Sequence, residues 1–377
     1  MSRIIATKGK TIAIILDMVL ELLYNVINEH HIFEICLLED WMGLFVDTDW
    51  QYRGLQVVRI ENEHIRVDVF PELGAKVYNF VHKDSDRNLL WHNPRVPPAR
   101  VAYGALFDDH WSGGWDELVP NDMPFPAPSG EMLPDHGEVW SQASEWDIIE
   151  KSDDVIAVRF VSHGRVLPTR FEKTISLRAG ESFCTVQYAY INLGATPIDF
   201  LWNICCPFEI TPATRLDIPA RRDIIEATDP WNTLKFNPGA EYDWPYATTP
   251  AGERVDFRTM PPEEAGVTDF QYLPNVSSGW YAVTDADAQV GFGMVFPTDV
   301  LPHISLFRSV GGWRGFHLVS VEPSVGYPYD LAIAKETGNA GRIEAGAIIE
   351  ATVKAIAYGG VSAVERIEPD GSVVAGG

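Results

Sequence analysis

The sequence predicts an all-β fold in which two large, mostly antiparallel sheets pack face to face. Three observations support this expectation. Short runs rich in β-branched and aromatic residues follow one another between residues 54 and 360, tight polar or glycine turns separate them, and no convincing long helix interrupts them. Many short strands joined by tight turns are typical of a sandwich of sheets.

Two stretches show the strand pattern most clearly. TRFEKTISLRAGESFCTVQYAYINLG (169–194) alternates apolar and polar residues on two arms around the turn Ala179-Gly180-Glu181, and GWYAVTDADAQVGFGMVF (279–296) has polar turn residues at 284–289. Such alternation gives each arm one face for the core and one for solvent. We expect further strands in LQVVRIE (55–61), HIRVDVF (64–70), AKVYNFVH (75–82), DVIAVRFVS (154–162), IDFLWNICCPFEI (198–210), FHLVSVEP (316–323) and AIIEATVKAIAYG (347–359).

The first 45 residues have a different pattern. Helical spacing of apolar residues predicts an amphipathic helix over 10–30, from Ile15, Met18, Val19, Leu22 and Leu23. We expect 1–45 to be a helical extension that docks on the body or on another subunit, which offers a route to an oligomer; 1–41 could also be dispensable. The main domain is expected over 50–365, with a flexible tail over 366–377.

The charge balance limits the partners. The formal net charge is −24, from 53 acidic and 29 basic residues, which disfavours binding to nucleic acid and to anionic membranes. No apolar run reaches the roughly 18 residues of a membrane span, and the N-terminus lacks a signal-peptide cleavage site. Four cysteines lack zinc-binding spacing, and we interpret them as reduced thiols of a cytoplasmic protein: Cys36, Cys184, Cys205 and Cys206.

Two long segments, 91–140 and 211–275, break the strand pattern and are rich in proline and acidic residues. Long irregular segments in a compact domain are often binding loops, and tryptophan-rich ones are rarely disordered. We therefore expect them to fold over one mouth of the sandwich. Their tryptophans are Trp91, Trp111, Trp115, Trp140, Trp231 and Trp244.

The first of these segments carries a candidate sugar site. DDHWSGGWDELVPN (108–121) and LPDHGEVW (133–140) bring aromatic rings beside carboxylates and imidazoles, which suits the apolar face and the hydroxyls of a sugar. The candidate contacts are His110, Trp115, Asp116, Glu117, His136 and Trp140. The same residues could instead be loop anchors, a solvated acidic face and, for His136, a turn residue.

Rival chemistries have weaker signals. Neither an H-E-x-x-H motif nor the spacing of a two-histidine facial triad is present, so we do not expect a metal. The sequence also lacks a G-x-S-x-G elbow, a P-loop and a G-x-G-x-x-G turn after a strand, which disfavours a serine hydrolase and a nucleotide cofactor.

A second candidate lies late in the chain. In HLVSVEPSVGYPYDL (317–331), Glu322 ends an apolar strand just before a proline. Partial burial at a strand end would raise the pKa of this carboxyl toward that of a useful general base. The alternative is an acid that pairs with Arg308 or Arg314.

Four segments, in order, resemble the galactose mutarotase-like superfamily, which includes the aldose 1-epimerases. They are VFPELGAKVYNFVHKDSDRNLLW (69–91), LPDHGEVW (133–140), INLGATPIDFLWNICCPFEI (191–210) and SVEPSVGYPYD (320–330). GGWDELVPN (113–121) is closer to uncharacterised relatives than to the galactose enzymes. The resemblance covers about residues 50–360 and implies a β-supersandwich.

The resemblance also implies a mechanism without a cofactor. Glu322 would remove the proton of the anomeric hydroxyl, and His136 would act as acid or as a ligand of the ring oxygen. Arg308, Tyr327 and Cys205 are then further expected contacts of the sugar. The second histidine of the family falls at Cys205 or Cys206, and a thiol is a poor proton donor beside an imidazole.

Three functions follow from this departure. The protein is an aldose 1-epimerase in which His136 acts alone or His110 or His303 supplies the second imidazole; or it binds sugar without catalysis; or it isomerises a sugar acid whose carboxylate pairs with Arg308 or Arg314. The alternative to any functional role for Cys205 and Cys206 is that they are small buried apolar residues. The sequence does not name the sugar.

Overall fold

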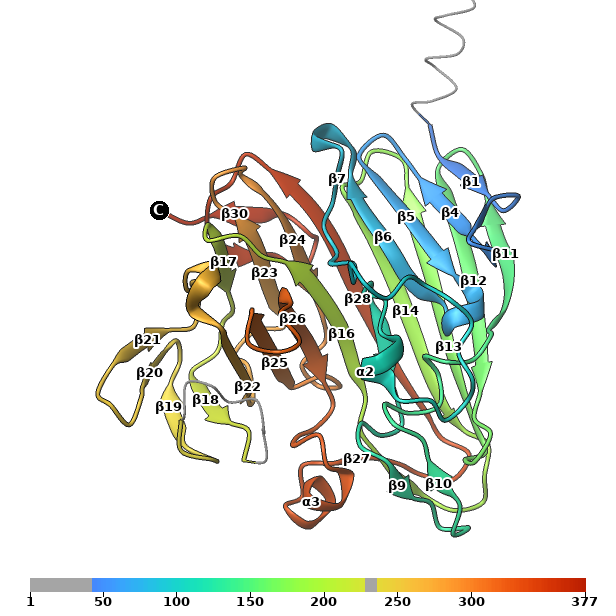
Figure 1. Cartoon of the computed structure of the whole chain (residues 1–377). Helices are drawn as coiled ribbons and strands as arrows, with labels where there is room; N and C mark the ends of the chain where they lie inside the picture. The colour runs from blue at the N-terminus through green and yellow to red at the C-terminus, as the bar shows by residue number, and fades with distance from the viewer. Residues whose placement is uncertain (1–42, 228–235) are drawn as a thin grey trace, which may run out of the picture. The chain divides into compact units, whose positions relative to one another are not determined.

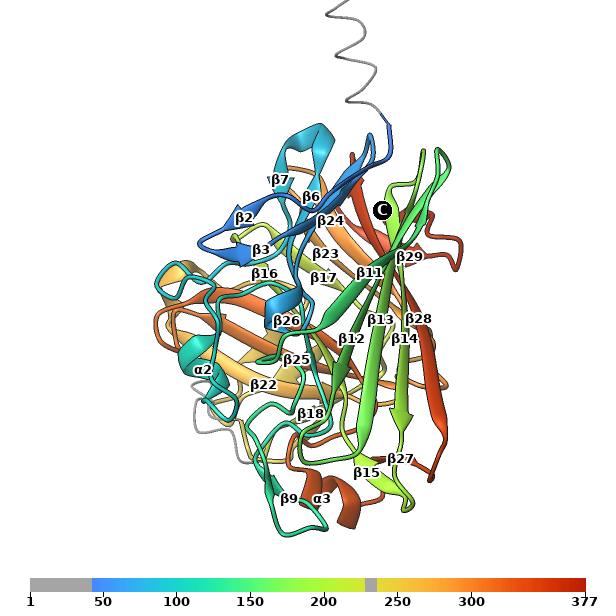
Figure 2. The ribbon, with the colours of Figure 1, turned by 90° about the vertical axis from the view of Figure 1, so that its right-hand side faces the viewer.

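The computed structural model describes residues 43–227 and 236–377, and residues 44–377 form one compact unit (Figure 1). The helix expected over 10–30, the thiol of Cys36 and the ring of Trp231 lie outside the described residues. Two large antiparallel sheets dominate the unit, which confirms the predicted all-β sandwich. Figure 2 shows β12, β13 and β14 of one sheet beside β22 and β25 of the other. Within the described ranges, no helix is long and apolar enough to cross a membrane.

The strands form three main sheets, in each of which spatial neighbours are joined by hydrogen bonds. The eight-stranded sheet has the spatial order β11 (Glu145–Lys151), β12 (Val155–His163), β13 (Thr169–Arg178), β14 (Phe183–Asn192), β28 (Ile348–Gly359), β24 (Val290–Val295), β23 (Trp280–Asp285) and β17 (Thr214–Asp217). The seven-stranded sheet has the order β19 (Glu241–Asp243), β18 (Arg222–Ile225), β22 (Val267–Leu273), β25 (His303–Val310), β26 (His317–Ser324), β16 (Asn203–Glu209) and β8 (Asp116–Leu118). The five-stranded sheet has the order β1 (Phe45–Asp47), β4 (Val58–Glu61), β5 (Ile65–Phe70), β6 (Lys76–His82) and β7 (Arg87–Asn88).

The remaining elements are short. The small strand pairs are β2 (Gln51–Tyr52) with β3 (Leu55–Gln56), β9 (Phe125–Pro126) with β10 (Met132–Leu133), β15 (Ile198–Phe200) with β27 (Gly341–Ile343), β20 (Tyr246–Thr248) with β21 (Arg254–Asp256), and β29 (Val364–Ile367) with β30 (Val373–Ala375). The helices are α2 (Phe107–His110), α3 (Leu331–Glu336) and the 3-10 turns η1 (Pro71–Leu73), η2 (Lys83–Ser85) and η3 (Glu263–Ala265).

The two hairpins expected from alternation are present. β13 pairs with β14 from Thr169 opposite Asn192 to Leu177 opposite Cys184, and burial along β13 alternates residue by residue. β23 pairs with β24 in the same way. The inward side chains of these strands pack into one large core, which includes Phe80, Phe160, Trp202, Phe208 and Tyr281.

Two expectations about irregular segments need correction. Residues 211–275, expected to be a long loop, contain β17 to β22, because three- to seven-residue strands between prolines and glycines are too short to show a clear period. Residues 366–377, expected to be a flexible tail, contain β30, which pairs with β29. Val373 packs against a cluster that includes Tyr358.

Strand β8 connects the three sheets through neighbouring acids. It pairs with β16 of the seven-stranded sheet. Asp116 accepts a hydrogen bond from Lys76 of β6 at 2.6 Å, and Glu117 forms an ion pair with Lys173 of β13 at 2.8 Å. All four side chains are almost wholly buried. Because a buried charge that loses its partner is costly, these two pairs hold β8 and its flanking loops in place.

Glu117→Gln should therefore destabilise the protein strongly, because it leaves the ammonium group of Lys173 buried without its counter-charge. We expect a loss of about 3–5 kcal/mol in the free energy of unfolding, measured by urea denaturation. Asp147→Asn, which breaks an exposed ion pair with Arg159, is the control and should have little effect. Equal effects of the two substitutions would contradict this role of β8.

Candidate active site

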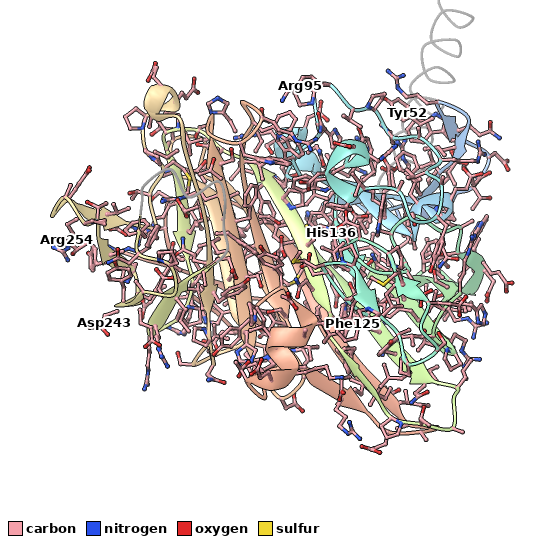
Figure 3. All side chains as sticks on the ribbon, turned by 60° about the horizontal axis from the view of Figure 1, so that its bottom comes forward. Tyr52, Arg95, Phe125, His136, Asp243 and Arg254 are labelled. Atoms are coloured by element: carbon pink, nitrogen blue, oxygen red, sulfur yellow. The ribbon has the colours of Figure 1, made fainter. Side chains whose placement is uncertain are left out.

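A cavity of about 350 Å³ lies where segments 106–124 and 135–136 meet the seven-stranded sheet. Figure 3 shows His136 near the middle of this face, whereas Asp243 and Arg254 lie at a distant edge. The cavity combines an apolar wall with a group of polar side chains. The wall consists of Leu106, Phe107, Trp111, Leu118, Met123, Pro124, Phe270, Phe307, Trp313 and Tyr329; the polar residues are Asp108, Asp109, Asp122, Asp135, His136, Cys205, Arg314 and Glu322.

Glu322 projects into the cavity from β26 and is almost buried. Ser320, two residues earlier and therefore on the same face of the strand, donates a hydrogen bond of 2.7 Å to Oε1 of Glu322. Burial raises the pKa of Glu322 to about 7, and the nearby Asp122 adds to this, although the bond from Ser320 opposes it. A carboxyl group with this pKa can exchange a proton near neutral pH.

His136 also lines the cavity, with both ring nitrogens beside carboxylates. Nδ1 is 3.0 Å from Oδ1 of Asp135, and Nε2 is 3.3 Å from Oδ1 of Asp122. The ring stacks on Phe107 at a centroid distance of 4.2 Å. Burial alone would lower the pKa of His136, but the two carboxylates outweigh it and raise the pKa to about 9. The imidazole therefore carries a positive charge at neutral pH.

The other residues of LPDHGEVW hold His136 in place. Gly137 has φ +82°, and an added Cβ would lie 2.2 Å from the carbonyl oxygen of Val119, so only glycine fits. The carboxylate of Glu138 accepts backbone hydrogen bonds from residues 165–167. Trp140 donates its indole N–H to the carbonyl oxygen of Asp135 at 3.0 Å. This fixes the loop to the body on both sides of the histidine.

Asp122 is a further titratable group of the cavity, beside Glu322 and His136. Its Oδ2 accepts a hydrogen bond of 3.1 Å from the side chain of Asn203 on β16, and its carbonyl oxygen accepts one of 2.5 Å from the backbone N–H of His136. Burial raises the pKa of Asp122, while the charge of His136 counteracts this. Asn203 and the ion pair with Nε2 of His136 thus hold the two carboxylate oxygens, while the backbone bond holds the main chain.

The sequence resemblance places a second histidine at Cys205 or Cys206; Cys205 lines the cavity, and Cys206 is buried in the core. The Sγ atom of Cys205 is 3.4 Å from Oγ of Ser320. Because the hydroxyl hydrogen of Ser320 is directed to Glu322, the thiol is the donor in this contact. Burial raises the pKa of Cys205 well above its ordinary value. Cys205 therefore supports Glu322 both through Ser320 and through its own side-chain hydrogen bond to Glu322.

Three expected sugar contacts lie beneath the cavity instead. Trp115 is fully buried in the core, and Asp116 and Glu117 face the lysines of the neighbouring sheets. Both acids lie on β8, where their carboxylates form ion pairs with the buried ammonium groups of Lys76 and Lys173. The sequence could not separate this role from sugar binding, because aromatic and acidic residues side by side suit both.

Four other expected contacts also lie away from the cavity lining. Arg308 is buried against Asp269 with a closest distance of 2.8 Å. The exposed His110 bonds to the carbonyl oxygen of Leu106. Trp140 packs edge-on against Phe107, one layer behind the cavity wall. Tyr327 packs against Tyr272 and His303, and Tyr329 lines the cavity in its place.

Two basic side chains considered from the sequence have other roles. Arg314 lines the cavity, but Asp109 holds its guanidinium group at 2.9 Å. His303, considered as a second imidazole, lies outside the lining residues, and its Nδ1 accepts the backbone N–H of Asn275. Burial lowers the pKa of His303 to about 4, so its ring is neutral at pH 7.

Three residues of the site were not predicted from the sequence: Asp122, Asp135 and Ser320. Two of them had a usable signal, because Asp135 precedes His136 and Ser320 occupies the same face of β26 as Glu322. Asp122 is fourteen residues from His136 in an irregular segment, and no periodicity connects them. Across residues 43–227 and 236–377, no three His, Cys, Asp or Glu side chains group so as to hold a metal ion.

Solved structures with the same fold support the resemblance seen in the sequence. A candidate aldose 1-epimerase from Klebsiella pneumoniae aligns with a TM-score of 0.64 at 13% identity, over 83% of this chain and 83% of that one. A galactose mutarotase-like protein from Clostridium acetobutylicum aligns with a TM-score of 0.60 at 9% identity, over 84% and 99%. The chain therefore has the fold of the galactose mutarotase-like proteins.

A larger protein contains the same fold. The chain aligns with a TPR-domain containing protein from Parabacteroides distasonis with a TM-score of 0.56 at 14% identity, over 80% of this chain, and spans only 47% of the length of that protein. No protein-family model matches the sequence, and no curated protein matches it.

The pKa values of His136, which faces the cavity, and His303, which is buried outside it, should be shifted in opposite directions from that of a free histidine. Proton-detected NMR should give a midpoint near pH 9 for His136 and near pH 4 for His303. Because folding raises the pKa of His136, its contribution to stability is complete below the unfolded pKa of about 6.5 and is lost as the pH rises through about 9. A midpoint for His136 at or below 6.5 would contradict the paired-carboxylate geometry.

Proposed function

We propose that the protein is a cofactor-free aldose 1-epimerase-like enzyme that interconverts the anomers of a free sugar. One observation carries this proposal: a buried acid with a pKa near 7 and a charged histidine with a pKa near 9 face the same cavity. Two titratable groups whose environments separate their pKa values are typical of an acid–base pair. The fold shared with mutarotase-like proteins agrees with this chemistry.

The proposed reaction begins at Glu322. Its carboxylate takes the proton of the anomeric hydroxyl. The group formed by His136 and its neighbouring carboxylates supplies a proton to the ring oxygen. The C1–O5 bond then breaks and leaves an open-chain aldehyde. Rotation about C1–C2 presents the other face of the aldehyde, and the reverse proton transfers close the ring. The aromatic wall would pack against the apolar face of the sugar.

The charges of the cavity favour a neutral sugar over a sugar acid. Five carboxylates line it against the imidazolium and one guanidinium. Arg308, one of the two arginines considered for a substrate carboxylate, is buried elsewhere, and Arg314 is already paired with Asp109. A uronate would therefore meet net repulsion.

Glu322→Gln should remove the acceleration of anomer exchange, because an amide cannot accept the proton. A loss of about 10²–10⁴-fold in kcat is expected with sugar affinity nearly unchanged, measured by polarimetry and calorimetry. Asp147→Asn, on the exposed strand β11, should keep full activity.

Two results would contradict the proposal. If Glu322→Gln accelerates exchange as well as the wild type does, Glu322 is not the base. If the wild type binds sugar saturably yet adds nothing to the buffer rate between pH 5 and 9, the protein is a carbohydrate-binding module that has lost its proton donor.

The rate of exchange should depend on pH in a bell shape. It should rise as the pH passes about 7, where Glu322 loses its proton and becomes a base, and fall as the pH passes about 9, where His136 loses its charge. The measurement is kcat/KM by NMR exchange after subtraction of the buffer rate. A rate that rises steadily to pH 10 would exclude His136 as a required acid.

A further inference from the structure

Both ring nitrogens of the charged His136 lie beside carboxylates, one in a hydrogen bond with Asp135 and the other in an ion pair with Asp122. A protonated imidazole has one hydrogen on each nitrogen. Nδ1 faces Asp135 at 3.0 Å and Nε2 faces Asp122 at 3.3 Å. Phe107 covers one face of the ring. A ring oxygen in the cavity would therefore compete with Asp122 for the proton of Nε2, and it would take full possession of that proton only by displacing the carboxylate.

Asp122 is held too firmly for such a displacement to be simple. Asn203 donates to its Oδ2, and the backbone N–H of His136 donates to its carbonyl oxygen. Its side chain nevertheless lines the cavity, as does that of Glu322. Asp122 thus lies beside Nε2 of His136 and also lines the cavity in which a substrate would bind.

We propose that Asp122 is the catalytic group that delivers the proton to the ring oxygen and so replaces the missing second histidine. This inference rests on the proposed epimerase function. The proton moves from Nε2 of His136 to Asp122 and from Asp122 to O5, as the C1–O5 bond breaks and Glu322 takes the proton of O1. Ring closure reverses each transfer and restores all three groups, so no external acid, oxidant or cofactor is required.

The other candidate donors are occupied. The thiol of Cys205 donates to Ser320, and that hydroxyl donates to Glu322, so this chain of hydrogen bonds serves the base. His303 lies outside the cavity lining. Asn203, which holds Asp122, lies on the same strand two residues before Cys205. Strand β16 therefore supports the base at one position and the proposed acid at another.

The charged groups around this relay are nearly all acidic. Asp108, Asp122 and Asp135 act on His136, and Asp108, Asp135, Glu226 and His136 act on Asp122; Glu322 interacts with both. The cations among the described residues of this group are the imidazolium and, beside Asp108, the guanidinium of Arg314. Removal of either neighbouring carboxylate should therefore ease loss of the proton from His136, and this makes the two aspartates a matched pair for a test.

The test compares Asp122→Asn with Asp135→Asn in the full-length protein. Each removes one carboxylate from one ring nitrogen, and both aspartates line the cavity, but only Asp122 would pass the proton to the substrate in the relay. With D-glucose and D-galactose as probes, kcat should fall at least about tenfold further for Asp122→Asn than for Asp135→Asn, with KM changed little in either. If His136 donates directly, Asp122→Asn instead frees Nε2 and keeps as much activity as Asp135→Asn, which would overturn the inference.

A second variant controls for misfolding. Asp122→Glu keeps a carboxyl group, and it should recover part of the kcat that Asp122→Asn loses, whereas a purely structural role predicts no recovery. NMR titration should show a lower midpoint for His136 in both asparagine variants. If Asp122→Asn does not fold, an Asp122→Glu variant that folds but has no activity above the buffer rate decides against the relay.

The outcomes also separate this inference from the proposed function. A wild type without acceleration would overturn both. A wild type that accelerates exchange through Glu322, with Asp122→Asn as active as Asp135→Asn, would leave the epimerase function intact and overturn only the relay.

Discussion

The structure depends on two buried ion pairs that strand β8 forms with its neighbours. Asp116 with Lys76 and Glu117 with Lys173 connect the short strand to the five- and eight-stranded sheets, while its backbone pairs with β16 of the seven-stranded sheet. Charges this deeply buried tolerate little displacement, since each needs its partner at hydrogen-bonding distance. β8 is therefore a fixed point, and the chain that leaves it reaches the cavity within a few residues.

Residues of the cavity on either side of β8 are connected to this strand. Asn203 pairs with Leu118 of β8 through the backbone and holds Asp122 through its side chain. The segment after β8 meets Gly137 at Val119 and so sets the place of His136. Cys205, opposite Asp116 in the same pairing, supports Glu322 through Ser320. Glu322 and His136 are thus both connected to β8 through backbone pairing and short hydrogen bonds.

The sequence predicted the sandwich and its long hairpins because a two-residue period survives over ten-residue strands. The strands between 211 and 275 were missed because most of them have only three or four residues, which cannot display a period. Glu322 and His136, which their motifs and the family resemblance suggested, both line the cavity, and their catalytic roles stay a prediction. The roles of Trp115, Asp116 and Glu117 were not predicted, because their lysine partners lie on other sheets. Asp122 could not be predicted as a site residue for the same reason, because its partners Asn203 and His136 come together only in the folded chain.

A sugar bound in this cavity is expected to lie between Glu322 and Asp122. A crystal structure of the Glu322→Gln variant with D-galactose tests this arrangement most directly. We expect the anomeric hydroxyl within hydrogen-bond reach of residue 322 and the ring oxygen within about 2.6–3.2 Å of a carboxyl oxygen of Asp122. A sugar bound outside the cavity, or one whose ring oxygen faces Cys205 with Asp122 turned away, would contradict the account.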